Sequence, residues 1–110
     1  MHKVSVIIAS WNRKEDLKRT LKSLQTQDYK DFEVIVIDNG SHDGSVELVE
    51  KDFPSVRLHK NKENLGVSIA KNQGTILGKG DYVHFLDSDI EMTHSQVISN
   101  MVKILEEHPE

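Results

Sequence analysis

Short apolar runs alternate along the chain with segments in which apolar residues recur at helical spacing. Four runs have the length and the β-branched or aromatic content of strands, and they occupy residues 3–9, 32–37, 56–59 and 82–86. Nearly continuous runs of this kind are typical of strands in a parallel sheet that is covered on both faces. The pattern therefore predicts four strands, and it predicts that the last one, 82–86, is buried.

Helical patterns follow each of these runs. The first covers residues 14–27 and is marked by three leucines at helical spacing, Leu17, Leu21 and Leu24. Asn12 and Glu15 resemble a capping box at its start, and Thr93 and Gln96 form one before the last helix. In that last helix we expect four residues to point inward, Val97, Met101, Ile104 and Leu105.

The two middle helices have simpler signals. A short helix carries Val46, Leu48 and Val49, and it ends before Pro54. The next helix covers residues 67–77, and its small residues Ala70 and Gly74 share one face with Leu77. Because small residues allow close approach, we expect this face to pack tightly on the sheet.

The order of elements defines the fold class. Strands that alternate with helices indicate parallel βαβ units, whose right-handed crossovers put helices on both faces of the sheet. We therefore predict an α/β fold with an open, mostly parallel sheet in the order 3-2-1-4. Residues 1–110 are expected to form a single domain, since this length suits one domain at most.

Composition excludes several classes of protein. The net charge of −4 argues against a nucleic-acid partner, whose binding surface is normally basic. The absence of cysteine excludes disulfides and thiol chemistry. No apolar run approaches the roughly 18 residues of a membrane span, and the N-terminal run indicates a core strand rather than a signal peptide.

Two carboxylates follow the last predicted strand, in Asp87-Ser88-Asp89. Open α/β sheets bind ligands at the carboxyl ends of their strands, and residues two apart in an extended chain point the same way. Carboxylate oxygens suit Mg²⁺ or Mn²⁺, whose remaining positions are often filled by water and substrate phosphates. The motif predicts a metal and phosphate site, with an ordinary solvated acidic turn as the alternative.

Five segments in register resemble family 2 glycosyltransferases of the GT-A fold. They are Val-Ser-Val-Ile-Ile-Ala-Ser-Trp-Asn-Arg (4–13), Asp-Asn-Gly-Ser-His-Asp-Gly-Ser (38–45), Asn-Leu-Gly (64–66), Ala-Lys-Asn-Gln-Gly (70–74) and Phe-Leu-Asp-Ser-Asp (85–89). The resemblance covers nearly the whole chain and implies the Rossmann-like, nucleotide-binding half of such an enzyme.

The resemblance also implies residue roles. Trp11 stands where the family stacks an aromatic ring on the nucleobase, and Asp38 and Asn39 stand where it hydrogen-bonds the base and ribose. Asp89 matches the usual metal ligand, and Asp87 matches the residue on the ribose and diphosphate side, so both are assigned to the metal. The implied nucleotide site is completed by Ser10, Lys71, Asn72 and Ser88.

The implied reaction is an inverting transfer of sugar from a nucleoside-diphosphate donor, with UDP or dTDP favoured, to a glycan, lipid or protein hydroxyl. It uses Mn²⁺ or Mg²⁺. The family's general base is expected beyond residue 110, so we assign no catalytic residue here and expect the isolated chain to be inactive. We expect a cytoplasmic location, either free or at the inner face of a membrane through a further part or partner. The surface left uncovered by the second half is expected to favour self-association.

Three positions depart from the family pattern, and other residues bear on rival functions. Ala9 replaces a common proline, Asn39 a frequent second aspartate, and Ile90 a further acid. Glu91 stands where an Asp-x-Asp phosphatase needs Thr or Val, and no G-x-G-x-x-G of a dehydrogenase follows the first strand. A non-catalytic nucleotide-binding module and a flavodoxin-like or receiver-like domain stay open as alternatives.

Local structural roles are the alternatives for single residues. Trp11 is either a nucleobase platform or a core residue, and Asp38 is either a ligand contact or a turn cap. For Asp43 we favour a helix cap over a ligand role.

Overall fold

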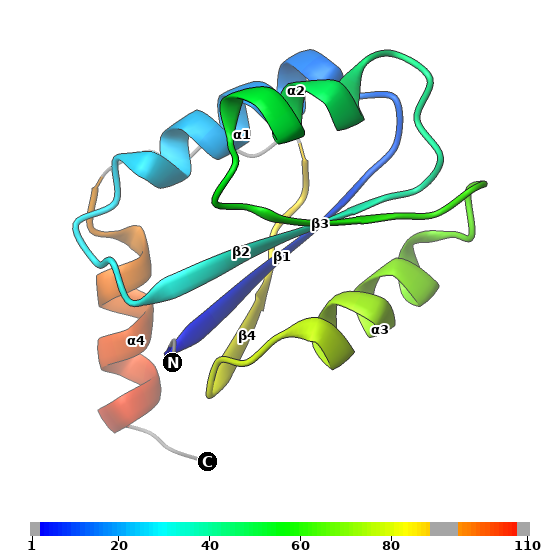
Figure 1. Cartoon of the computed structure of the whole chain (residues 1–110). Coiled ribbons are helices and arrows are strands. Elements are labelled where there is room, and N and C mark those ends of the chain that lie inside the picture. The colour runs from blue at the N-terminus through cyan, green and yellow to red at the C-terminus, as the bar shows by residue number, and fades with distance from the viewer. Residues whose placement is uncertain (1–2, 89–94, 108–110) are drawn as a thin grey trace.

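The computed structural model describes residues 3–88 and 95–107. Strands and helices alternate along it (Figure 1) in the order β1 (Val4–Ser10), α1 (Lys14–Gln25), β2 (Phe32–Asp38), α2 (Ser45–Asp52), β3 (Arg57–Lys60), α3 (Val67–Leu77), β4 (Tyr82–Phe85) and α4 (Val97–Glu107). The strands form one parallel sheet in the order β3-β2-β1-β4. The predicted α/β fold, with strand order 3-2-1-4, is confirmed.

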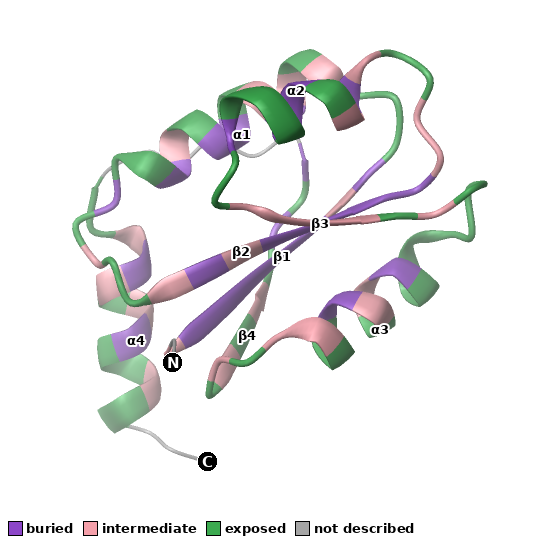
Figure 2. Cartoon of the chain, in the orientation of Figure 1, coloured by how far each residue is buried: buried purple, intermediate pink, exposed green. Residues whose placement is uncertain are grey.

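Helices cover both faces of the sheet, as predicted: α1, α2 and α4 lie on one face and α3 on the other (Figure 1). The larger core joins strand residues such as Val6 and Val36 to the leucines of α1. The smaller core, under α3, consists of Ile7, Ile35, Ile37 and Ala70. The most continuous burial follows β1 and β2 (Figure 2), so these two strands are the rigid centre from which the site is built.

The close contact between α3 and the sheet follows from small side chains. Ala70 and Gly74 are the buried residues of this helix. A Cβ atom at Gly74 would lie 2.3 Å from Cγ2 of Ile7, so only glycine fits there without a shift of the core. The prediction of a tightly packed face is confirmed.

Strand β4 differs from its prediction as a buried strand. Its pairing with β1 places Val83 beside Ser5 and Phe85 beside Ile7, on the face that α3 covers. Helix α3 packs on β1 and β2, however, and Val83 and Phe85 remain 41% and 44% exposed. The prediction was wrong because the strand order makes β4 an edge strand within the described part of the chain.

The start of α1 is also built differently from the prediction. Its N-cap residue is Arg13, without a side-chain cap, so Asn12 and Glu15 do not form a capping box. Asn12 has a left-handed backbone with φ of 50°, and its Oδ1 accepts from the N–H of His42. The first helical N–H, on Lys14, donates to a carboxylate oxygen from the next loop along the sheet. Contacts between loops have replaced the local cap.

In α4, the expected inward set is confirmed for Met101, which packs against the larger core, but not for Ile104. Ile98 and Val102 are buried, whereas Ile104 is 59% exposed. The predicted capping box at Thr93 lies outside the described residues. Instead, the N–H of Ile98 donates to Oε1 of Gln27, which is buried in the turn after α1. No helix in the described part of the chain has the length and apolarity needed to cross a membrane.

A buried carboxylate ties the strands together at the amino-terminal edge of the sheet. Glu33 accepts hydrogen bonds from the Ser5 hydroxyl at 2.6 Å, the Lys79 N–H at 2.6 Å and the Arg57 guanidinium at 3.1 Å. Burial raises the pKa of Glu33, but these three donors outweigh burial and hold the pKa below its ordinary value. The segment before β4 is therefore fixed at the end of the sheet opposite to the predicted site.

Candidate functional site

Ser10 and Asp38 lie side by side at the carboxyl ends of β1 and β2. They are register partners, and each is only 2% exposed. Asp38 Oδ2 accepts from the N–H of Ser41 at 2.9 Å. Asp38 Oδ1 and Ser10 Oγ are buried with no hydrogen-bond partner among the described residues. Buried polar atoms are nearly always paired, so these two exceptions make Ser10 and Asp38 the centre of the candidate site.

Asn39 is buried beside them, but its amide is engaged in the protein. Its Oδ1 accepts from Asn61 Nδ2 at 2.9 Å and from the Leu65 N–H at 3.4 Å, and its Nδ2 donates to the Gly66 carbonyl at 3.3 Å. Asn61 in turn exchanges hydrogen bonds with Gln73 of α3. Asn39 thus holds the loop between β3 and α3. Its contact with a base or ribose stays a prediction.

Trp11 lies half exposed, at 50%, in the loop after β1. This exposure is inconsistent with the simple core role considered for it. Two hydrogen bonds join this loop to the loop after β2. The Asn12 N–H donates to Ser41 Oγ at 2.9 Å, and the His42 N–H donates to Asn12 Oδ1 at 2.8 Å. The loops after β1 and β2 therefore form one unit that presents an aromatic ring next to Ser10.

Asp43 has a structural role in this unit. Its Oδ2 accepts from the Lys14 N–H, and its Oδ1 accepts from the N–H and hydroxyl of Ser45. It precedes Gly44, the N-cap of α2, and serves the first residues of two helices. Burial raises the pKa of Asp43, but the donors outweigh it and lower that pKa.

We call Ser10, Trp11, Asp38 and Asn39 the β1–β2 group.

Lys71 and Asn72 lie on α3. Lys71 Nζ is 5.3 Å from the centre of the Phe85 ring on β4, a cation–π contact. Phe85 is two residues before Asp87, so Lys71 brings a positive charge close to the end of β4. Asn72 is exposed.

Asp87 and Ser88 follow β4 at the same edge of the sheet. Asp87 is exposed and Ser88 is buried. The main chain on either side of Asp87 is fixed, because the Leu86 N–H donates to the Ile7 carbonyl at 2.9 Å and the Ser88 carbonyl accepts from Thr20 Oγ1 at 2.9 Å. We call Lys71, Asn72, Asp87 and Ser88 the β4 group. Asp89 lies outside the described residues.

The donor chemistry of the β4 group fits a divalent cation. Asp87 offers exposed carboxylate oxygens, which Mg²⁺ and Mn²⁺ prefer. Residues 3–88 and 95–107 contain no group of three or more His, Cys, Asp or Glu side chains arranged to hold a metal ion. A cation held here would depend on ligand phosphates and water for its remaining positions.

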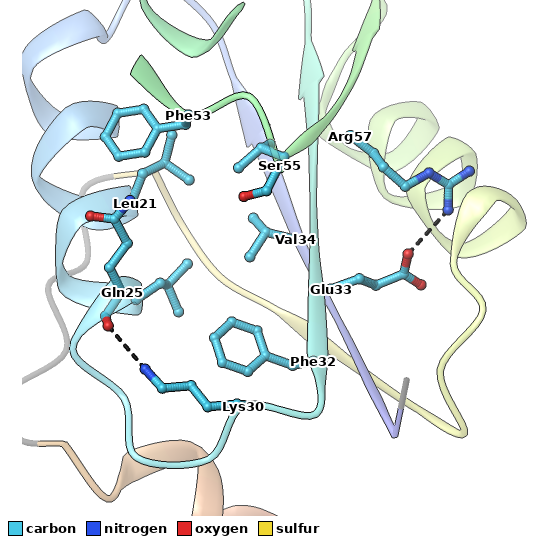
Figure 3. A pocket seen from close by; sticks show the side chains of 11 residues that line it. Leu21, Gln25, Lys30, Phe32, Glu33, Val34, Phe53, Ser55 and Arg57 are labelled. Carbon is cyan, nitrogen blue, oxygen red and sulfur yellow. Dashed lines mark hydrogen bonds and ion pairs between the residues drawn. The ribbon is translucent and has the colours of Figure 1, made fainter. Parts of the chain in front are cut away.

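Two hollows lie near these elements. One, of about 560 Å³, is lined by Trp11 and the first residues of α1 together with Asp43, so it borders the β1–β2 group. The other, of about 440 Å³, lies between α1, the amino-terminal part of β2 and residues 53–57, which follow α2 (Figure 3). No predicted site residue lines the second hollow. We therefore assign it no part in the candidate site.

Sequence reasoning missed three polar side chains that support the site: Thr20, Gln27 and Asn61. Thr20, on α1, and Gln27, in the turn after it, are fully buried. Thr20 donates to the Ser88 carbonyl, and Gln27 accepts from the Ile98 N–H. Their positions relative to Leu17, Leu21 and Leu24 continue the apolar face, which was a readable signal. Asn61 carried no such signal, because its partners come from other loops.

Comparison with known proteins identifies the family. The profile described as Glycosyl transferase family 2 matches residues 5–110, nearly the entire chain. The chain belongs to this family.

A curated relative, described as the uncharacterized glycosyltransferase YibD of Escherichia coli K12, is 37% identical over 109 residues. That match covers 96% of this chain and 31% of YibD. The chain thus spans about a third of the length of this relative.

Solved structures agree in fold. TarS 1–349 of S. aureus in complex with UDP-GlcNAc matches with a TM-score of 0.88 and 28% identity, over 97% of this chain and 32% of that one. The mannosyltransferase PcManGT of Pyrobaculum calidifontis, in complex with GDP-Man and Mn²⁺, matches with a TM-score of 0.86 and 27% identity, over 94% of this chain and 32% of that one.

Proposed function

We propose that this chain is the donor-binding part of an inverting glycosyltransferase that moves a sugar from a nucleoside-diphosphate sugar to an acceptor hydroxyl. The observation that carries the proposal is a pair of buried atoms, Asp38 Oδ1 and Ser10 Oγ, that have no hydrogen-bond partner within residues 3–88 and 95–107. They lie next to the half-exposed Trp11 in the chain or in the strand register. Family membership supports the reaction class. The nucleotide-sugar complexes of TarS and PcManGT support the ligand class.

In this proposal the β1–β2 group binds the nucleoside. The exposed Trp11 ring stacks on the base, an interaction worth on the order of 1–3 kcal/mol in single-stranded nucleic-acid binding. Asp38 Oδ1 accepts a hydrogen bond from the base or ribose, and the Ser10 hydroxyl pairs with a neighbouring polar atom of the ligand. A hydrogen bond to a charged group contributes about 1.5–3 kcal/mol. A UDP or dTDP donor remains the favoured class.

The β4 group binds the diphosphate. Asp87 and Asp89 are the proposed ligands of Mn²⁺ or Mg²⁺, with Asp89 the direct one, and Lys71 and Asn72 lie on the donor side. A bound divalent cation neutralises the charge that develops on the departing diphosphate. Ser88 orients the main chain between the two carboxylates.

Proton removal from the acceptor hydroxyl needs a positioned base, which contributes about 10²–10⁴-fold. We assign that base and the acceptor site to a part of the protein beyond residue 110, as the family resemblance implies. The relative YibD is about three times as long as this chain, which is consistent with such a part. We therefore expect these 110 residues to bind donor without transferring sugar.

Calorimetry with UDP in the presence of Mn²⁺ tests the proposal. Trp11→Ala and Asp38→Asn should each weaken binding by about tenfold or more. Asp52→Asn, which changes an exposed carboxylate at the end of α2, should leave binding unchanged. Wild-type protein that does not bind UDP or another nucleoside diphosphate, or folded Trp11 and Asp38 variants with wild-type affinity, would contradict the assignment.

The same experiment distinguishes the alternatives. A non-catalytic nucleotide-binding module would bind UDP equally well with EDTA and with Mn²⁺. A flavodoxin-like domain would bind a flavin in place of UDP.

A further inference from the structure

The hydroxyl of Thr20 joins α1 to the β4 group. Thr20 is fully buried, and its Oγ1 donates to the main-chain carbonyl of Ser88 at 2.9 Å. A threonine inside a helix commonly directs its hydroxyl to a carbonyl one turn earlier in the same helix. This hydroxyl instead bonds a residue 68 positions away. The contact is therefore a tertiary tether.

Asp87 lies between two residues whose main chains are hydrogen-bonded to the rest of the fold, Leu86 and Ser88. The Leu86 N–H donates to the Ile7 carbonyl at 2.9 Å, immediately before Asp87. Leu86 and Ser88 are buried, whereas Asp87 is exposed. A solvent-exposed carboxylate is thus carried by a main chain that is fixed on both sides. Such fixing reduces the ordering that ligand binding would otherwise require.

Helix α1 connects this tether to the other half of the site. It begins three residues after Trp11, at Lys14, and Thr20 lies six residues further along. Six helical residues correspond to a rise of about 9 Å. One rigid element therefore sets the separation between the Trp11 loop and the Ser88 carbonyl. The turn after α1 adds a second connection, because the Asp28 N–H donates to the Ser95 carbonyl at 2.7 Å.

We propose that Thr20 is a positioning residue that acts through Ser88. Its hydrogen bond holds Asp87 at a fixed place relative to Trp11, so that base and diphosphate are bound together. Without the hydroxyl, the buried Ser88 carbonyl loses its side-chain donor and shifts toward water, and Asp87 moves with it. This proposal rests on the proposed function, and Thr20 itself touches no substrate in it.

Three variants of the full chain test the tether. Thr20→Val keeps the shape and removes the donor, Thr20→Ser keeps the donor, and Ser23→Ala removes a hydroxyl that donates to the Thr20 carbonyl within the helix. For each, UDP affinity is measured by calorimetry once with EDTA and once with Mn²⁺, and the melting temperature is recorded. The quantity of interest is the gain in UDP affinity that Mn²⁺ produces.

Thr20→Val should reduce this gain by about threefold to tenfold, the range that corresponds to one lost hydrogen bond, and leave the affinity in EDTA unchanged. Thr20→Ser and Ser23→Ala should keep the gain. A purely structural role would lower the melting temperature of Thr20→Val and leave the gain intact, which would overturn the proposal. Should Thr20→Val fail to fold, Thr20→Cys keeps a similar volume with only a weak donor and carries the same expectation.

Two outcomes distinguish the proposed metal site from the role of Thr20. Wild-type protein that shows no gain from Mn²⁺ would overturn the proposed metal site and this proposal with it. A wild-type gain that persists in the folded donor-less variants would overturn only the role of Thr20.

Discussion

Replacing Ser10 with alanine should stabilise the free protein and weaken its binding of nucleotide. Ser10 is buried, and its hydroxyl has no partner among the described residues. A buried polar group left unsatisfied costs about 1–3 kcal/mol. Ser10→Ala removes that cost at the loss of one packed oxygen atom. We expect the free energy of unfolding to rise by about 1 kcal/mol, equivalent to about 4 °C in melting temperature for a domain of this size.

Ser45 provides a matched control, because it is 1% exposed and its hydroxyl is paired. Ser45 Oγ donates to the Asp43 carboxylate at 2.5 Å. Ser45→Ala removes the same atom from an equally buried site, but here it breaks a hydrogen bond to a charged group. The free energy of unfolding should fall by about 1.5–3 kcal/mol. The same substitution is thus expected to have opposite signs at the two positions.

Urea unfolding without ligand measures both changes, and calorimetry with UDP on the same samples measures binding. Ser10→Ala should weaken UDP binding, since the ligand loses its partner hydroxyl. If Ser10→Ala destabilises the protein as Ser45→Ala does, the Ser10 hydroxyl is paired in solution and the reasoning is wrong. If it stabilises the protein but UDP binding is unchanged, the hydroxyl is not kept for the nucleotide.

Three further predictions concern packing, pH and metal. Gly74→Ala should lower the free energy of unfolding by about 1–3 kcal/mol in urea titrations, because its Cβ would lie 2.3 Å from Ile7, although alanine favours helix. Burial lowers the pKa of His84, so the folded state favours the neutral ring. Stability should therefore fall as pH drops below about 6.5, and His84→Gln should flatten that part of the pH profile. Asp89→Asn should abolish the gain in UDP affinity from Mn²⁺ without changing the affinity in EDTA, and Asp87→Asn should retain part of it, as calorimetry in both conditions would show.

The predictions from sequence succeeded where neighbours along the chain decide the structure. The apolar runs of β1 and β2 and the Ala70–Gly74 spacing of α3 are local patterns, and the structure has these strands and this close packing. Parallel order followed from the alternation of elements. The positions of Ser10 and Asp38 at one sheet edge followed from that order.

The failures occur where a distant partner decides. Phe85 looked buried because an apolar run does not reveal whether a strand lies at the edge. Asn12 was assigned to a local cap, but its side chain bonds the loop after β2. Thr20 was passed over as one polar residue in a leucine pattern, although its partner is 68 residues away. Polar residues in register with an apolar helix face thus indicate buried partners that the local sequence does not identify.

The pairing of β4 implies that the β4 group and the β1–β2 group differ in their free energy of local unfolding. Strands β1, β2 and β3 associate through successive βα units, whereas β4, of four residues, returns from the far end of the chain to pair with β1. Short, half-exposed edge strands open locally at a lower free energy than central strands. Hydrogen exchange should therefore show two protection levels, with β4 exchanging before β1 and β2. A molecule in that locally unfolded state would keep Ser10 and Asp38 in place while Asp87 is released. Under the proposed function, the nucleoside would then find its part of the site formed before the diphosphate does.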